Sequence, residues 1–139
     1  MYKLFFKRLI DFIASLILLV LLLIPFLIIA ILIKLDSKGS IFYRQIRVGQ
    51  NCKEFKIFKF RTMVSNADKI GGYSTLKNDS RITKIGQFLR KTSLDELPQV
   101  INVILGDMSL IGPRPDVSAQ KIYYPEKAWV TSHIVKPGI

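Results

Sequence analysis

Cysteine and histidine are nearly absent from this sequence, since Cys52 and His133 are the only residues of their kinds in 139 positions. A single cysteine excludes a disulfide framework within the chain, and such usage is typical of a reducing compartment. Zinc centres are built mainly from Cys and His ligands, so a Cys/His zinc cluster is excluded as well. A bound metal would need oxygen ligands, which favour Mg²⁺.

Acidic residues are also scarce. The chain has 10 Asp and Glu against 21 Lys and Arg, which gives a formal net charge of +11. So basic a chain attracts anions, and nucleic acid, an anionic membrane surface and phosphorylated small molecules are the candidate partners. The length leaves room for one small domain beside any membrane segment.

A charge-free apolar run extends from Phe12 to Ile33. Such a run, of about 22 residues, is long enough to cross a bilayer as one helix. It is too long for the apolar region of a cleaved signal peptide, and no small-residue cleavage site follows it. The composition changes sharply after Gly39. We therefore predict a membrane segment over residues 1–36 and a second domain over residues 37–139.

Two features of the apolar run argue against a simple spanning helix. Pro25 lies in the middle of the run, where it removes a backbone hydrogen bond and kinks a helix. Positive charges flank both ends, and under the positive-inside rule both ends then prefer the cytoplasm. A helix broken at Pro25 can enter one leaflet and turn back. The residues alone leave the re-entrant and the spanning arrangements open.

Two stretches rich in Phe, Tyr, Ile and Val, residues 40–48 and 54–63, flank Gly49-Gln50-Asn51. This pattern predicts a β-hairpin. The hairpin carries several basic residues among its aromatics: Arg44, Arg47, Lys53, Lys56, Lys59 and Arg61. Such a pattern can bind single-stranded nucleic acid, but next to a membrane segment it favours lipid headgroups or phosphates. The alternative is that these basic side chains face solvent and bind no ligand.

The remaining segments predict a loop, an amphipathic helix and an interfacial segment. The polar residues 64–80 contain Gly71-Gly72 and predict a mobile loop that is a candidate lid. Apolar side chains at helical spacing between Ile82 and Leu89 predict an amphipathic helix, which lies on the membrane surface, packs on the domain core, or does both. Residues 121–139 carry Tyr and Trp, which suit an interfacial segment.

The stretch Ser93-Leu94-Asp95-Glu96-Leu97-Pro98-Gln99 predicts a helix start. Proline tolerates only the first helical turn, and Ser93 with Glu96 forms a capping-box pattern. Asp95 and Glu96 would then lie at the positive end of the helix dipole, beside unpaired N–H groups. This setting keeps a carboxylate ionised and attracts a phosphate. The simpler interpretation is that the two acids only stabilise the helix start.

A second candidate phosphate ligand follows the helix, which we expect to end at Gly106. Pro113 and Pro115 restrict the backbone on both sides of Arg114 and favour an extended segment. A guanidinium fixed in this way loses less entropy when it binds a phosphate through two hydrogen bonds. Taken alone, such a segment is more often a turn than a site.

In their order and over essentially the whole chain, these features resemble the small monotopic phosphoglycosyl transferases, the bacterial sugar transferase family. The resemblance is carried by Lys7-Arg8 with Asp11-Phe12, Arg47-x-Gly49, Lys59-Phe60-Arg61-Thr62-Met63, Arg90-Lys91-x-Ser93-Leu94-Asp95-Glu96-Leu97, Gly106-Asp107-Met108-Ser109 and Gly112-Pro113-Arg114-Pro115. It implies a membrane-associated (monotopic) α/β fold with an N-terminal re-entrant helix broken at Pro25, a β-hairpin, and surrounding amphipathic and interfacial helices.

The resemblance also implies an activity at the cytoplasmic face of the bacterial inner membrane, among its lipids. A UDP-sugar would give its phospho-sugar to the enzyme, UMP would leave, and polyprenol (undecaprenyl) phosphate would accept the phospho-sugar and begin glycan assembly. Asp95 would be the nucleophile and a ligand of Mg²⁺, and Glu96 the neighbouring acid or base. The cations expected to bind the substrate phosphates are Lys59, Arg61, Arg90 and Arg114.

Two departures from the family pattern qualify these expectations. Ile24 precedes Pro25 where the family commonly has serine, whose hydroxyl could satisfy a carbonyl freed by the proline. Family members usually continue beyond a motif like Lys136-Pro137-Gly138-Ile139, so we expect the catalytic domain over 37–139 to be incomplete at its C-terminus. The alternatives are an inactive, truncated member that only binds the membrane surface and, from charge alone, a membrane-tethered nucleic-acid binder. On the basis of the resemblance, we expect that the protein does not bind nucleic acid.

A cysteine-accessibility scan tests the re-entrant arrangement. Single cysteines at residues 1–5, in a chain with Cys52 replaced by serine, are expected to react with a membrane-impermeant reagent only from the cytoplasmic side. The reason is that the positive charges hold both ends of the helix on that side. Reaction from the opposite side would exclude the re-entrant helix.

Overall fold

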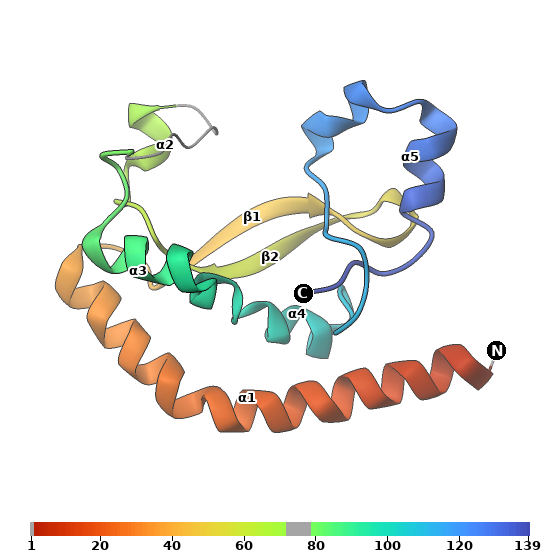
Figure 1. Ribbon diagram of the computed structural model, residues 1–139, viewed down its shortest axis with the longest axis horizontal. Helices are drawn as coiled ribbons and strands as arrows, with labels where there is room; N and C mark the ends of the chain where they lie inside the picture. The colour runs from red at the N-terminus through yellow and green to blue at the C-terminus, as the bar shows by residue number, and fades with distance from the viewer. Residues whose placement is uncertain (1, 72–78) are drawn as a thin grey trace. The chain divides into compact units, whose positions relative to one another are not determined.

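The computed structural model describes residues 2–71 and 79–139 and combines a long N-terminal helix with a two-stranded sheet and short helices (Figure 1). In chain order the elements are α1 (Tyr2–Asp36), β1 (Phe42–Val48), η1 (Gln50–Cys52), β2 (Glu54–Phe60), α2 (Ala67–Ile70), α3 (Lys84–Thr92), η2 (Leu94–Glu96), α4 (Gln99–Leu105), η3 (Ser118–Tyr123) and α5 (Glu126–Ser132). This composition agrees with the predicted α/β class. The predicted loop over residues 64–80 contains the short helix α2, so it is not a loop throughout, and residues 72–78 of this candidate lid lie outside the described residues.

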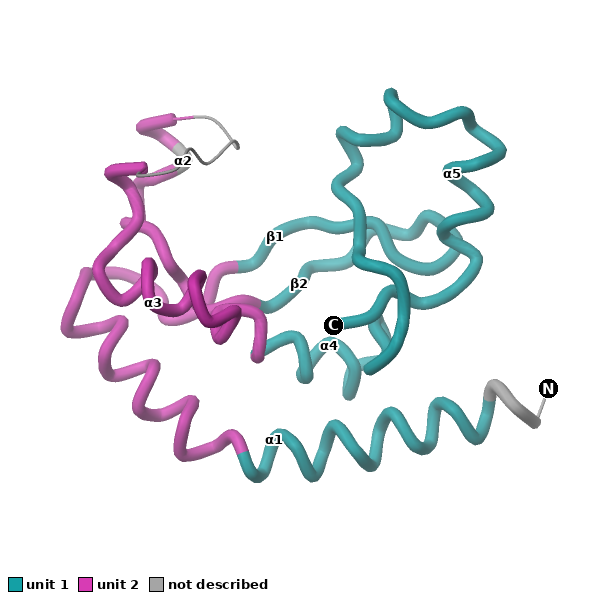
Figure 2. The backbone as a smooth tube through the Cα atoms, in the orientation of Figure 1, with its two compact units in different colours: residues 1–21, 44–58, 98–139 teal, residues 22–43, 59–97 magenta. Residues whose placement is uncertain are grey.

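The chain divides into two compact units (Figure 2). Unit 1 comprises Met1–Leu21, Arg44–Phe58 and Pro98–Ile139. Unit 2 comprises Leu22–Tyr43 and Lys59–Leu97. Each unit is defined by the contacts within it, and the boundary between the units passes through α1 and through both strands. The predicted boundary at residue 36 concerns the membrane and stays a prediction.

Helix α1 is long and apolar. Its residues Phe5–Asp36 have the length and composition to cross a membrane, and most of its side chains are exposed. The helical backbone continues through Pro25, which has no N–H to donate to the carbonyl of Leu21. An apolar surface on all sides of a helix is typical of a membrane environment. Re-entry of α1 into one leaflet stays a prediction.

The predicted β-hairpin is confirmed, with β1 and β2 paired through the short connection that contains η1. Asn51 and Cys52 adopt left-handed backbone conformations there, with φ of 57° and 59°. Asn enters this region more readily than most residues because its short polar side chain can hydrogen-bond locally. On the hairpin, the guanidinium of Arg44 lies 4.4 Å from the centre of the Phe58 ring. This basic side chain therefore packs on an aromatic face.

The core of unit 2 forms between the C-terminal half of α1, β2 and α3. Its buried members are Ile29, Ile33, Phe60 and Leu89, with Phe26, Ile41, Ile85 and Leu94 packed around them. Ile85 and Leu89 share one face of α3 because they are four positions apart. The predicted packing of the amphipathic helix on the core is therefore confirmed, and its contact with the membrane surface stays a prediction. Phe88 is exposed on another side.

The core of unit 1 forms between β2 and α4. Ile57, Val103 and Met108 are buried there, with Phe55 and Leu110 beside them. The fully buried Asn102 side chain donates to the Lys56 carbonyl and accepts from the Phe58 amide, both at 2.9 Å. A side-chain amide thus continues the hydrogen-bonding edge of β2 and fixes α4 to the strand.

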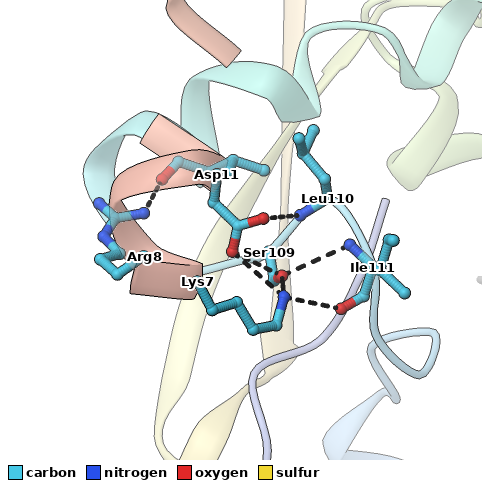
Figure 3. A network of polar contacts seen from close by, with 7 residues as sticks. Lys7, Arg8, Asp11, Ser109, Leu110 and Ile111 are labelled. Carbon is cyan, nitrogen blue, oxygen red and sulfur yellow. Dashed lines mark hydrogen bonds and ion pairs between the residues drawn. The ribbon is translucent and has the colours of Figure 1, made fainter. Parts of the chain in front are cut away.

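A polar network fastens the first turns of α1 to the loop after α4 (Figure 3). The Asp11 carboxylate accepts from the Ser109 hydroxyl at 2.8 Å and from the Lys7 ammonium at 3.3 Å. Lys7 also donates to the hydroxyl of Ser109. Arg8 donates to the carbonyls of Val103 and Ile104 near the end of α4. These bonds satisfy carbonyls that a helix end leaves without partners.

The predicted helix start near residue 95 is wrong. Ser93 lies in the left-handed region at φ 57° and closes α3, because its amide donates to carbonyls in the last turn of that helix. Its side chain makes no capping bond, so the capping box is absent. Asp95 and Glu96 lie in the 3₁₀ turn η2, and α4 begins only after Pro98. The predicted end at Gly106 is confirmed, with φ 97°.

Replacing Gly86 in α3 by alanine tests how closely this helix lies against the chain after β2. A Cβ at Gly86 would stand 2.8 Å from the Cα of Thr62 and would overlap its carbonyl. Alanine favours a helix by up to about 1 kcal/mol, whereas overpacking costs about 1–3 kcal/mol. Since backbone atoms cannot rotate away, Gly86→Ala is expected to lower the free energy of unfolding in detergent. Gln87→Ala, at an exposed position of the same helix, should leave it nearly unchanged.

Candidate active site

The acidic pair, Asp95 and Glu96, lies in η2 between α3 and α4. The Glu96 amide donates to the Ser93 carbonyl at 3.2 Å, which closes the turn. Ser93 reverses the chain through its left-handed conformation, so the pair follows directly on the end of α3. Both side chains are partly buried. The pair is thus placed by the end of α3, not by the start of α4.

Lys59, at the end of β2, forms an ion pair with this turn. Its Nζ lies 2.7 Å from Oε1 of Glu96, and the two side chains are 14% and 29% exposed. Water screens such a partly buried pair less than it screens an exposed one. The contact therefore orients the Glu96 carboxylate and brings a strand lysine to the acidic pair.

The Asp95 carboxyl has a shifted ionisation. Burial raises its pKa above the usual range and outweighs the Lys59 ammonium, which acts in the opposite direction. The Glu96 charge raises this pKa further, while Arg90 lowers it. Ionised Asp95 is therefore a poorly solvated carboxylate next to cations. Such a carboxylate has lost part of the hydration that would weaken it as a nucleophile.

Arg90 lies in the last turn of α3, and its Nε donates to the Thr62 hydroxyl at 2.8 Å. Its charge also acts on Asp95. Unit 2 therefore brings together four of the residues predicted for the site, namely Asp95, Glu96, Lys59 and Arg90. They are far apart in the sequence, and the core packing of β2 against α3 places them.

Arg61 has different contacts from those predicted. Its guanidinium is buried and donates to the carbonyls of Ser37 and Lys38 at 2.7 and 2.8 Å, and so holds the chain that leaves α1. Gly39, at φ +129°, leaves room for it, because a Cβ there would stand 3.2 Å from the Arg61 Cζ. These contacts support a structural role. Phosphate binding by Arg61 stays a prediction, and the contacts of its guanidinium do not support it.

Arg114 belongs to unit 1 and is exposed. The Pro115 carbonyl accepts from Nη1 of Arg47 at 3.2 Å, and Asp116 pairs with Val48 of β1. The segment that carries Arg114 is thus fastened to the hairpin. This agrees with the restricted, extended backbone that its two prolines favour. Its place relative to the acidic pair stays a prediction.

The sequence reasoning missed Thr62 and Asp36. Thr62 stands within the quoted stretch of residues 59–63, but nothing in the sequence pairs it with Arg90. Asp36, the last residue of α1, accepts from the Ile85 amide at 2.9 Å in the first turn of α3. The only local signal for such a contact is that first-turn amides need acceptors. The acceptor for the Ile85 amide is supplied by α1, nearly fifty residues earlier in the chain.

Together, an acidic pair and cations from a strand and a helix form a site suited to phosphorylated substrates. Residues 2–139 match the family model described as bacterial sugar transferase. The chain belongs to this family.

Three relatives show the similarity. The chain is 46% identical over 138 residues to a UDP-glucose:undecaprenyl-phosphate glucose-1-phosphate transferase of Klebsiella pneumoniae, covering 96% of this chain and 29% of that protein. It is 52% identical over 110 residues to the exopolysaccharide production protein PSS of Rhizobium leguminosarum bv. phaseoli, covering 78% and 54%. It is 41% identical over 137 residues to a UDP-N-acetylgalactosamine-undecaprenyl-phosphate N-acetylgalactosaminephosphotransferase of Aeromonas hydrophila, covering 97% and 32%. The chain thus spans between about a third and a half of these relatives.

Replacing Lys59 by methionine tests the electrostatics of the site. The ammonium of Lys59 opposes the effect of burial on the pKa of Asp95, so its loss is expected to raise that pKa further. The midpoint of the Asp95 carboxyl ¹³C resonance in an NMR titration should therefore move to higher pH. Lys84→Met, at an exposed position at the start of α3, is the matched control and should leave the midpoint in place. An unchanged midpoint in the Lys59 variant would contradict the proposed coupling.

Proposed function

We propose that this chain contributes the reaction centre of a phosphoglycosyl transferase. The reaction transfers a phospho-sugar from a UDP-sugar to polyprenol phosphate and releases UMP. The observation that carries the proposal is the partly buried Asp95 beside Glu96, with Lys59 ion-paired to the turn and Arg90 at the end of α3. The names of the Klebsiella and Aeromonas relatives, which describe this type of transfer, support it.

In the first step, an Asp95 carboxylate oxygen attacks the phosphorus that bears the sugar. A P–O bond forms to Asp95, and the bond from this phosphorus to the bridging oxygen breaks, so UMP leaves with that oxygen and its electron pair. An anion attacks an anion here, which is unfavourable unless cations offset the repulsion. Lys59 and Arg90 supply positive charge at the site. Removing one such contact typically costs about 3–4 kcal/mol of transition-state stabilisation.

In the second step, an oxygen of polyprenol phosphate attacks the same phosphorus. The acyl-phosphate bond breaks, Asp95 is regenerated and a polyprenyl diphosphate sugar is formed. Glu96 receives the proton that the acceptor phosphate gives up, and its ion pair with Lys59 holds the carboxylate in place for this. A covalent intermediate divides one difficult transfer into two easier ones.

We also propose that Asp95 binds a Mg²⁺ ion. Among the residues that the structure describes, no group of three or more His, Cys, Asp and Glu side chains is assembled for a metal. Mg²⁺ is commonly bound by only one or two carboxylates together with substrate phosphates, and the Asp95 carboxylate could supply one of them. Asp95 would hold the ion, which would supply positive charge to the diphosphate when bound.

The acceptor lipid implies a membrane location. We propose that α1 embeds in the bacterial inner membrane among its lipids, with the site on the cytoplasmic face. Its exposed apolar surface and the basic residues near both of its ends support this arrangement. In the re-entrant form, Pro25 marks the turn of the helix. The exposed apolar side chains would otherwise face water over the length of the helix.

Asp95→Asn tests the proposed nucleophile. The amide cannot form an acyl-phosphate, so this variant is expected to lose both UMP release and covalent labelling by a UDP-sugar carrying a radioactive phosphate next to the sugar. The assay uses detergent, Mg²⁺, polyprenol phosphate and a panel of UDP-sugars. Glu126→Gln, an exposed carboxylate in the first turn of α5, is the control and should keep any activity of the parent chain.

The possible outcomes separate the alternatives. Labelling of the Asp95 variant at the parent level would refute the nucleophile assignment. A parent chain that binds anionic vesicles but neither releases UMP nor becomes labelled would support the membrane-surface binding module instead.

A further inference from the structure

We propose that Thr62 is a positioning residue for Arg90, and that its hydroxyl directs the guanidinium of Arg90 toward the diphosphate of the donor. This inference rests on the proposed function and deepens it. Thr62 lies just after β2, and its side chain is buried, with 7% of the residue exposed. Its hydroxyl accepts from Nε of Arg90 at 2.8 Å.

The place of Thr62 is fixed by its backbone. Its carbonyl accepts from the Thr83 amide at 3.1 Å, at the residue that caps α3. Gly86 lies against the same backbone so closely that only the absence of a side chain allows it. Arg90 lies one turn further along. Residues 83, 86 and 90 therefore share one face of α3, and all three contact Thr62.

This arrangement decides which edge of the guanidinium meets a ligand. An arginine has one N–H on Nε and two each on Nη1 and Nη2, in a rigid plane. When Thr62 accepts from Nε, that N–H is engaged, and the Nη1–Nη2 edge is the one that would meet two phosphate oxygens. Bidentate binding of this kind is stronger and more specific than a single contact. Under the proposed function the phosphorus lies next to Asp95, which is close enough to Arg90 to feel its charge.

Thr62→Val removes the hydroxyl while keeping the shape of the side chain, and Thr62→Ser keeps the hydroxyl. A hydrogen bond to a charged group is worth about a tenfold to hundredfold change in an equilibrium constant. UDP binding, measured by calorimetry in detergent, and the KM for the UDP-sugar are expected to worsen by that factor in Thr62→Val, with a smaller change in kcat. Thr62→Ser should restore both.

Thr92→Val is the matched control. It makes the same chemical change in the last turn of α3, the helix that carries Arg90, where the hydroxyl donates to the carbonyls of Phe88 and Leu89. It should bind UDP like the parent chain. Thermal unfolding of all variants separates loss of folding from loss of binding, and Thr62→Ser keeps the test valid should Thr62→Val unfold.

A double-mutant cycle with Arg90→Gln identifies the route of the effect. If Thr62 acts through Arg90, Thr62→Val should add nothing to the loss already caused by Arg90→Gln. Independent, additive losses would overturn the positioning role. Equal UDP affinity of the parent chain and Thr62→Val would overturn it as well.

NMR of the arginine Nε–H group reports the hydrogen bond without any activity. The Arg90 resonance, assigned from its loss in Arg90→Gln, should shift in Thr62→Val and stay in place in Thr62→Ser. An unshifted resonance would overturn the inference. A shifted resonance in a parent chain that binds no UDP would preserve the contact but overturn the proposed function, and with it the role of Thr62 toward a diphosphate.

Discussion

The close contact between α3 and the backbone of Thr62 is the constraint on which the candidate site depends. Gly86 lets the two come together, and the buried Ile85 and Leu89 hold the helix on the core of unit 2. The end of α3 then places Arg90, and the left-handed Ser93 that closes this helix leads directly into η2. The site is thus positioned by a helix end and a strand end that share one core.

Electrostatics within this frame give the site its chemistry. Burial makes the charge of Asp95 costly, and the Lys59 ammonium compensates only in part. Since the folded pKa lies above that of the unfolded chain, the ionised Asp95 lowers stability as the pH rises from the unfolded value through the folded one. A buried carboxylate that lowers the stability of the fold when it is ionised is typical of a functional site.

Each part of the long helix α1 is held by polar contacts within its own unit, and the part in unit 2 also packs on the apolar core of that unit. In unit 1, Lys7, Asp11 and Ser109 form one network. In unit 2, Arg61 holds the carbonyls that follow the helix, and Asp36 accepts from the first turn of α3. The same α3 carries Arg90, so the end of the proposed membrane helix and the candidate site share a structural element. Arginine and aspartate are well suited to such helix ends, because carbonyls and amides there lack partners.

The sequence by itself determined the long apolar helix, the hairpin, the amphipathic α3, the end of α4 at Gly106 and the two acids of the pair. These features follow from local patterns of hydrophobicity, glycine and charge, which act over a few residues. It misplaced the start of α4, because a Ser-x-x-Glu pattern cannot show that Ser93 already closes the preceding helix. Only the tertiary structure decided that Lys59 reaches Glu96, that Thr62 receives Arg90 and that Arg61 is held by the chain after α1. These contacts join residues between 23 and 37 positions apart, and such pairings are set by the packing of β2, α1 and α3 rather than by any local preference.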